Sequence, residues 1–168
     1  VQTVSAAQHV VGGGCSGQGI SLLGESNQEI KTINEYRVMP GLCELMKFEL
    51  KDGKYFNDDN PSNKSSVVIN DAAASMLGIS DSTVGRKVVM FDNPMEVIGV
   101  VHNFFYDSPA RPVEPIVLTC YQSYPSVIYV RFDPLVNKSE AAQLILPVFR
   151  QFDPDFVLNP SWCDDIYK

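Results

Sequence analysis

The segment Glu96–Val101, EVIGVV, restricts the fold most strongly, because its four β-branched residues are interrupted only by Gly99. Neighbouring side chains of a strand point to opposite faces, so a run of this kind buries a strand on both sides. Gly99 permits a bulge or the close approach of another backbone segment. The strand leads directly into His102, one of only two histidines in the chain. We therefore expect a sheet-based domain in which His102 is either a catalytic group or part of a structural corner.

The same periodicities predict further elements along the chain. The expected strands are a half-exposed strand over 29–38, a buried strand over 67–71, a hairpin of 87–91 and 95–101 around Asp92-Asn93-Pro94, and strands over 116–120, 126–132 and 156–158. The expected helices are the end of a helix over 1–9, helices over 42–48, 71–77 and 138–152, and a final helical turn from Ser161. Asn70 or Asp71 would cap the helix over 71–77, and Gly78 would end it. The last elements follow the order β-α-β.

Length and charge limit the class of protein. The chain has 168 residues, 45% of them hydrophobic, which suits one globular domain or two small lobes. A chain of this size buries roughly 70% of its unfolded surface, so it needs neither a disulfide nor a metal to fold. Its net charge is −7, and no run of lysines or arginines occurs. Binding to a nucleic-acid backbone is therefore not expected.

The two ends of the sequence suggest an excised domain. No window approaches the roughly 18 to 20 apolar residues that cross a bilayer. The start, VQTVSAAQHV, begins without Met and lacks the basic and apolar regions of a signal peptide. The end, at Tyr167-Lys168, is abrupt. We expect targeting and anchoring segments to lie outside this sequence.

The four cysteines are widely spaced and show no C-x-x-C pair or histidine at zinc-ligand spacing. Their even number allows disulfides in an oxidising compartment, and buried free thiols fit equally well. The sequence leaves both possibilities open and predicts no metal site. The residues concerned are Cys15, Cys43, Cys120 and Cys163.

The glycine-rich stretch 12–19, GGGCSGQG, contains the letters of a dinucleotide-binding motif, Gly12-x-Gly14-x-x-Gly17. That motif requires a helix directly afterwards, whose N–H groups bind the pyrophosphate. The following SLLGES is too short for this helix and is broken by Gly24. The stretch also lacks the last glycine of the nucleophile elbow of serine hydrolases. We expect a flexible or turning loop here, and no cofactor.

Two acidic pairs, Asp58-Asp59 and Asp164-Asp165, offer oxygen ligands for a hard cation. The spacing of an EF-hand, with glycine at the sixth and glutamate at the twelfth position, is absent. We interpret the pairs as solvated charges at a turn and at a helix start.

His102 would act as a general base only beside a nucleophile and an orienting carboxylate, which sequence alone does not place. His9 or His102 together with one of the cysteines would form a thiol hydrolase, although no local motif supports it. In the structural interpretation, the buried strand ends at His102, and Phe104-Phe105 anchor the chain as it leaves the sheet.

Several stretches together resemble one known family. They are LKDGKYF (50–56), SVVINDAAASMLG (66–78), VGRKV (84–88) and EVIGVVHNFFYDSPARPVEPIVL (96–118). Together they resemble the extracytoplasmic core domain of MacB/FtsX-type ABC transporter permeases. The resemblance is strong over 50–118, and the order of elements extends it across nearly the whole chain.

Individual positions match the family pattern of a glycine-aromatic turn, a valine-rich strand entering an alanine-rich helix, and an apolar strand followed by a polar pair and Phe. The matching residues are Gly53, Phe56, Asn70, Ala72 to Ala74, Gly85, Gly99 to Phe104, and Pro115-Ile116-Val117. His102-Asn103 stands where many members carry Lys-Asp, which weakens any claim of a common ion pair. The resemblance attaches no catalytic role to His102 and implies a strand-exit corner.

The resemblance implies an α+β fold with two lobes. A membrane-proximal lobe of β-α-β units (Porter-like), built from both chain ends, would comprise 1–57 and 124–168. A mainly β lobe (Sabre-like) over 58–123 would be inserted between them. Transmembrane helices are expected before Val1 and after Lys168.

The implied function is that of a periplasmic domain in a permease subunit of the bacterial inner membrane. It would transmit ATP-driven transmembrane movements to substrate export, lipoprotein release or activation of a partner. Its partners would be a second permease subunit, a separate cytoplasmic ATPase, and a periplasmic adaptor, a lipoprotein or an outer-membrane channel. No catalytic, cofactor or metal residue is implied. Two alternatives stay open: a freestanding cell-envelope binding module, and an envelope hydrolase using a thiol or histidine.

Overall fold

The computed structural model describes residues 1–11, 13–24, 29–58, 60–105, 112–120 and 125–166. Its strands are β1 (Thr3–Ala7), β2 (Ser16–Leu22), β3 (Lys31–Val38), β4 (Leu50–Gly53), β5 (Ser66–Asn70), β6 (Lys87–Met90), β7 (Asn93–Val101), β8 (Ile116–Cys120) and β9 (Val127–Arg131). Its helices are α1 (Leu42–Met46), the 3-10 helix η1 (Pro61–Ser65), α2 (Asp71–Leu77), α3 (Lys138–Arg150) and α4 (Cys163–Ile166). The predicted α+β class is confirmed. The division into lobes at 57/58 and 123/124 stays a prediction.

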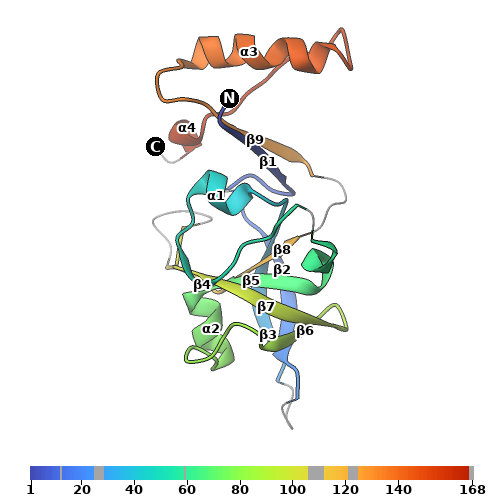
Figure 1. The fold of residues 1–168 in the computed structure, drawn as a ribbon, viewed down its shortest axis with the longest axis vertical. Coiled ribbons are helices and arrows are strands. Elements are labelled where there is room, and N and C mark those ends of the chain that lie inside the picture. Colours follow the sequence, from blue (N-terminus) through green and yellow to red (C-terminus); the bar gives the residue numbers. More distant parts are fainter. Residues whose placement is uncertain (12, 25–28, 59, 106–111, 121–124, 167–168) are drawn as a thin grey trace.

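Six of the strands close into a ring. The ladder runs from β2 through β6, β7, β5 and β8 to β3. A further antiparallel pairing of β2 with β3, from Ser16↔Glu35 to Ile20↔Lys31, joins the two ends of this ladder. Closure pairs the strand edges that an open sheet would leave free. Figure 1 shows this strand ring in the lower part of the molecule.

The strand ring encloses an apolar core, to which all six of its strands contribute. The buried residues from the strands are Ile20, Leu22, Ile33, Val67, Ile69, Val88, Met90, Met95, Val97 and Val117. Helix α2 adds Ala73, Ala74 and Leu77 to the same cluster. The small side chains of the predicted alanine-rich helix therefore allow α2 to pack closely against the ring.

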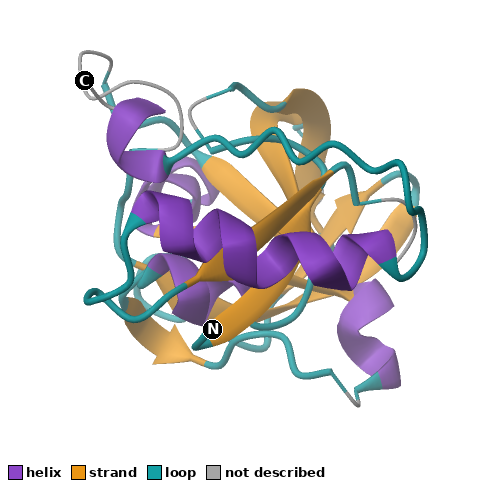
Figure 2. Ribbon diagram, turned by 90° about the horizontal axis from the view of Figure 1, so that it is seen from above, coloured by secondary structure: helices purple, strands orange, loops and turns teal. Residues whose placement is uncertain are grey.

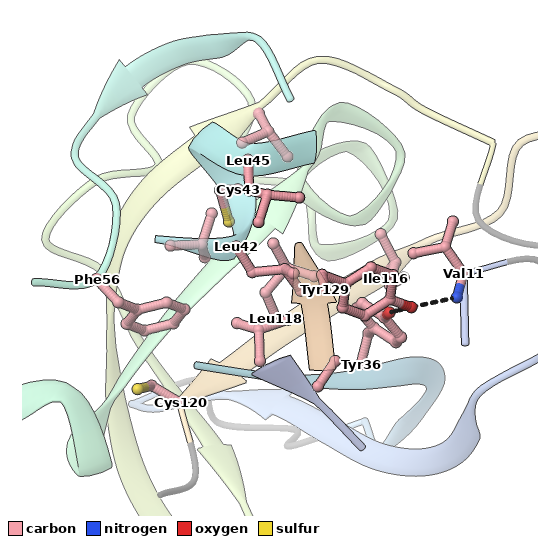
Figure 3. Packing of buried hydrophobic residues seen from close by; sticks show 14 of the residues in the cluster. Val11, Tyr36, Leu42, Cys43, Leu45, Phe56, Ile116, Leu118, Cys120 and Tyr129 are labelled. Carbon is pink, nitrogen blue, oxygen red and sulfur yellow. Dashed lines mark hydrogen bonds between the residues drawn. The ribbon is translucent and has the colours of Figure 1, made fainter. Parts of the chain in front are cut away.

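A second core lies on the outer face of β3 and β8. Strand β8 is buried at every residue: Val117 belongs to the ring core, whereas Ile116 and Leu118 belong to the second core. Helix α1 covers this face with Leu42 and Leu45 (Figure 3). Burial on both sides explains why the segment is apolar except at Thr119, whose buried hydroxyl donates to Glu35.

Asn70 begins α2, as the sequence predicts. Its Oδ1 accepts hydrogen bonds from the N–H of Ala73 at 2.9 Å and from the N–H of Ile116 at 3.0 Å. Its Nδ2 donates to the carbonyl of Glu114 at 3.0 Å. Gly78 ends the helix in the left-handed region, with φ 70°. One buried amide therefore fixes both the start of α2 and the entry into β8.

Gly99 lies where β7 and the end of β4 approach closely. A Cβ at Gly99 would lie 2.3 Å from the carbonyl oxygen of Lys54, and one at Gly53 would lie 2.2 Å from that of Ile98. The pairing of β5 with β7 is irregular at the same point. The predicted bulge or close approach at Gly99 is confirmed.

The predicted hairpin is confirmed, but its turn lies earlier than expected. Phe91 and Asp92 occupy the turn with φ of 51° and 59°, the left-handed pair that a two-residue hairpin turn requires. Asn93 and Pro94 already belong to β7, where Pro94 pairs with Val89.

β1 and β9 form an antiparallel pair outside the strand ring, from Thr3↔Arg131 to Ala7↔Val127. Figures 1 and 2 show α3 crossing this end of the molecule, close to the N-terminus, with α4 nearby. Ala141 is the buried residue of α3, while Leu144 and Val148 are 51% and 53% exposed. We call β1, β9, α3 and α4 the terminal region, which is thinly covered compared with the ring.

The predicted helix over 1–9 is wrong, because Thr3–Ala7 form β1. Val1, Val4 and Ala7 happen to match helical spacing. In the structure, burial alternates with the period of a strand: Ser5 and Ala7 are buried, whereas Val4 is 56% exposed. The partner strand β9 lies far along the chain, so no local pattern reveals the pairing.

Three other predictions also differ from the structure. Residues 156–158 form no strand; Phe156 instead stacks on Phe149 of α3, with ring centroids 4.7 Å apart. The predicted β-α-β order at the end of the chain is therefore not formed. Residues 16–19 of the expected glycine loop belong to β2. They pair with β3 through the backbone, which needs no side chains. Strand β3 is exposed at Thr32, as predicted for a half-exposed strand, but Glu35 and Tyr36, on opposite faces, are both buried.

Candidate functional site

His102 lies at the exit of β7, in a polar corner at the start of α2. Its Nδ1 lies 3.2 Å from Oδ2 of Asp71, and Nζ of Lys51 lies 2.6 Å from Oδ1 of the same carboxylate. Asn103 accepts a hydrogen bond from the N–H of Ala72 at 3.0 Å. These contacts join three elements, and they fit the predicted structural corner.

The pKa of Asp71 is lowered from its usual value. Burial alone would raise it, but the hydrogen bond and charge of Lys51, followed by those of His102, outweigh that effect. The His102 side chain is about half exposed, and its hydrogen-bond partner among the described residues is this carboxylate. The described part of the chain places no hydroxyl or thiol nucleophile at hydrogen-bond distance from the His102 ring.

Three of the thiols, Cys43, Cys120 and Cys163, have pKa values shifted in the direction opposite to that of a nucleophile. Burial raises the pKa of Cys43 to about 12 and that of Cys120 to about 11. Burial also raises the pKa of Cys163. A reactive cysteine needs a lowered pKa, because the thiolate is the attacking species. Cys43, Cys120 and Cys163 are free thiols in this structure.

The acidic pairs and the glycine motif form no ligand cage in the described part of the chain. Gly12 and Asp59 lie outside the described residues. No group of three His, Cys, Asp or Glu side chains with metal-ligand spacing occurs within 1–11, 13–24, 29–58, 60–105, 112–120 and 125–166. Asp165 instead binds Lys138 at 2.6 Å, consistent with a solvated charge beside a helix.

Glu35 is a buried carboxylate that the sequence did not single out. Its Oε1 accepts hydrogen bonds from Thr119 at 2.8 Å and from Nε of Arg37 at 3.1 Å. Its Oε2 is buried and has no hydrogen-bond partner among the described residues. Arg37 also lies over the ring of Phe91, at 5.8 Å from the centroid. This cluster links β3, β8 and the β6–β7 turn.

The terminal region joins the strand ring at a narrow junction between β1 and β3. A single residue pair, Ala7↔Val38, connects the two strands. Two backbone hydrogen bonds, of 3.0 and 2.8 Å, flank this pair. β1 therefore leaves β3 after one pair and continues along β9.

Two tyrosine hydroxyls hold the segment that follows β1. Tyr36 of β3 and Tyr129 of β9 both donate to the carbonyl oxygen of His9, at 2.8 and 3.1 Å. The Tyr129 hydroxyl accepts a hydrogen bond from the N–H of Val11 at 2.8 Å, and the two hydroxyl oxygens lie 3.2 Å apart. Figure 3 shows the two hydroxyls meeting beside Val11. Burial raises the pKa of Tyr129, so its hydroxyl stays protonated and able to donate.

Further contacts attach the terminal region to α1. The Ser5 hydroxyl donates to the carbonyl of Pro40 at 2.8 Å. The guanidinium of Arg131 donates to the carbonyl of Leu45 at the end of α1. We take this junction, where β1, β9, β3 and α1 meet, as the candidate functional site.

Sequence reasoning missed the residues of this junction. Tyr36 was placed on a half-exposed strand, and nothing in the pattern around Tyr129 indicates a partner at His9. The available signal was the presence of a tyrosine within each of two apolar strands, because a buried phenol normally finds a hydrogen-bond partner.

The comparisons with known proteins agree with the predicted resemblance. The family model of the MacB-like periplasmic core domain matches residues 1–148. No curated protein matches the chain. None of the helices in the described ranges is long and apolar enough to cross a membrane.

Three solved structures share the fold. The periplasmic region of MacB from Actinobacillus actinomycetemcomitans is 17% identical, with a TM-score of 0.64 over 95% of this chain and 72% of that one. The extracellular domain of the noncanonic ABC-type transporter YknZ from Gram-positive bacteria is 20% identical, with a TM-score of 0.60 over 89% and 76%. A domain of a protein described as a permease from Porphyromonas gingivalis is 14% identical, with a TM-score of 0.67 over 99% and 82%. Because the family model matches most of its length, the chain belongs to the family of MacB-like periplasmic core domains, which are extracytoplasmic domains of ABC transporter permeases.

Proposed function

We propose that this domain transmits ATP-driven movements of transmembrane segments to a process in the periplasm. The process would be substrate export, lipoprotein release or activation of a partner, and the anchoring membrane would be the bacterial inner membrane. The observation that carries the proposal is the gathering of β1, α3 and α4 at one end of the molecule (Figure 1). Movements that reach the domain through β1 or through α3 and α4 would therefore act on the same region.

The strand ring suits the receiving end of such a movement. Its strands close on themselves and enclose a packed apolar core. Packed interiors deform little, so a closed ring is displaced as a unit. The junction at Ala7↔Val38 would be the point where displacement of the terminal region reaches the ring. The two bodies of the proposal are therefore the terminal region and the strand ring, whose β2 and β3 lie within 1–57. The lobe bounds 1–57 with 124–168, and 58–123, stay a prediction.

Coupling, and not catalysis, is the proposed role. The raised thiol pKa values and the Asp71–His102 contact support this choice over an envelope hydrolase. The proposed partners are a second permease subunit and a separate cytoplasmic ATPase. An adaptor, a lipoprotein or an outer-membrane channel would receive the movement in the periplasm.

Distance measurements between spin labels test the proposal in the full-length permease with its ATPase in lipid nanodiscs. Two single-label variants are used, and each distance is measured between the two subunits. The first variant carries Leu135→Cys, which is 92% exposed just before α3. The second variant carries Asp81→Cys, which is exposed in the segment after α2. Helices α2 and α3 lie toward opposite ends of the molecule (Figure 1). The background carries Cys15→Ser and Cys163→Ser. Cys43 and Cys120 stay, because burial and pKa values of about 12 and about 11 keep them unlabelled.

ATP, added with a hydrolysis-deficient ATPase, is expected to change the distance between equivalent labels of the two subunits. The change is expected for both labelled positions. An ATPase variant that does not bind nucleotide is the control. Distances that stay unchanged at both positions would overturn the proposal and favour a binding module that does not move with nucleotide.

A further inference from the structure

We infer that the hydroxyls of Tyr36 and Tyr129 are the positioning groups that make the terminal region and the strand ring move together. The inference rests on the proposed function and names the contact through which it operates. That contact is the carbonyl oxygen of His9, which both hydroxyls reach, at 2.8 and 3.1 Å.

The two tyrosines belong to the two bodies that must be coupled. Tyr36 lies on β3 of the ring, and Tyr129 lies on β9 of the terminal region. His9 lies in the segment between them in space, just after β1. A shift of the terminal region against the ring therefore lengthens at least one of the hydrogen bonds to His9. A side-chain contact of about 3.6 Å is no longer a hydrogen bond, so displacements well below about 1 Å are enough to break these bonds and the network resists them.

Burial makes this resistance stronger than the same contacts would provide at the surface. Tyr36 and Tyr129 are 2% and 7% exposed. When their hydrogen bonds break, the N–H of Val11 loses a partner at a buried contact, and the carbonyl of His9, at a partly buried position, loses two donors. An unpaired buried polar group is unfavourable, so the network favours one arrangement of the segment.

The segment also leads to the strand that closes the ring. After Val11 the chain continues to Ser16, where β2 begins and pairs with Glu35 of β3. The hydroxyl pair thus joins β9 and β3 to the segment that precedes β2 in the chain.

The test uses the double variant Tyr36→Phe/Tyr129→Phe, which keeps both rings and removes both hydroxyls. Tyr55→Phe is the matched control, because the Tyr55 hydroxyl donates to Phe48 next to α1 and does not bridge the terminal region and the ring. The first measurement is amide hydrogen exchange in the full-length permease without nucleotide. Exchange in a peptide covering 8–11 is expected to become about tenfold faster in the double variant, while peptides of β5 keep their rates.

The second measurement repeats the nucleotide-dependent distances at Leu135→Cys and Asp81→Cys. In the double variant, nucleotide is expected to move the label at Leu135→Cys as before and to leave the label at Asp81→Cys in place. Tyr55→Phe is expected to preserve both movements.

The outcomes separate this inference from the proposed function. Unchanged exchange over 8–11 overturns the role of the hydroxyls, whatever the distances show. Two labels that still move together in the double variant overturn it as well. If neither label moves in the protein with both tyrosines, the proposed function fails, and the exchange measurement still decides whether the hydroxyls position the segment.

Discussion

The strand ring and the terminal region are stabilised in different ways. In the ring, β5 and β8 are buried at every residue, and every strand has a neighbour on each side. In the terminal region, Val4 of β1 and Ile128 of β9 are 56% and 53% exposed, and β1 meets the ring through one residue pair. The comparison teaches that one domain can combine a closed body with a region attached by one strand pair, a few hydrogen bonds and a shared apolar cluster that includes Ala7 and Tyr129. The weakly attached region is the one that responds first to an applied force.

The comparison is tested most strongly by equivalent leucine truncations in the two regions. Leu118→Ala removes a fully buried side chain from β8 and is expected to lower the free energy of unfolding by about 3 kcal/mol, because it leaves a cavity. Leu144→Ala in α3, where the side chain is 51% exposed, is expected to lower it by less than about 1 kcal/mol. Urea denaturation measures both. Equal losses would contradict the contrast between the regions.

A glycine substitution examines the close approach in the ring. Gly99→Ala brings a Cβ to 2.3 Å from the carbonyl of Lys54 and is expected to lower the free energy of unfolding by about 2 kcal/mol, since the backbone must shift. Gly17→Ala in β2 is the control, because its nearest contact would be an ordinary 3.8 Å from Thr32. We expect a change below about 0.5 kcal/mol for this control. If Gly99→Ala leaves the free energy of unfolding unchanged, β4 is free to move away from β7.

The asparagine caps of α2 and α3 sharpen the same comparison. Asn70→Ala removes the N-cap of α2 together with the hydrogen bonds to Ile116 and Glu114, so a loss of about 2 kcal/mol is expected. Asn137→Ala removes only the exposed cap of α3, a bond of 3.0 Å to Glu140, and should lower stability by about 1 kcal/mol or less. Thermal unfolding of both variants gives the ranking, and the reverse order would refute it.

The smallest expected effect concerns pH. Because the folded pKa of Asp71 is lowered from 3.8, its contribution to stability is fully present well above that pH. It is lost as pH falls from about 4 through the lower folded value. The contribution should stay below about 1 kcal/mol, because the carboxylate is partly exposed to solvent. Asp71→Asn should therefore lose less stability than the unsubstituted protein between pH 7 and pH 3 in urea titrations. Parallel loss in both proteins would assign the acid sensitivity to other groups.

Local patterns sufficed for the parts of the ring whose strands are buried on both faces. The apolar runs of β5, β7 and β8, the capped helix α2 and the strongest part of the family resemblance all lie within 50–120. In these elements, propensity, capping and burial favour the same structure, so a single sequence predicts them.

The remaining features depend on contacts between distant segments. Ring closure by β2 involves a glycine-containing strand without a clear apolar pattern. β1 becomes a strand because of β9, and Glu35 is buried because Thr119 and Arg37 bind it. The junction at His9 depends on two hydroxyls from separate strands. A periodicity within one window contains no information on such pairings.

The distance along the chain between the two strands of the terminal region affects the order of assembly. Val11 and Tyr129, which bond directly, are 118 residues apart, and the strands from β2 to β8 lie between them. During synthesis and export, the intervening strands emerge first, so the ring can close while β9 is still missing. β1 then stays unpaired along one edge until β9, in the last third of the chain, has been synthesised. Assembly of the terminal region is thus the late step, and a chain interrupted before β9 would leave β1 open to proteases and chaperones.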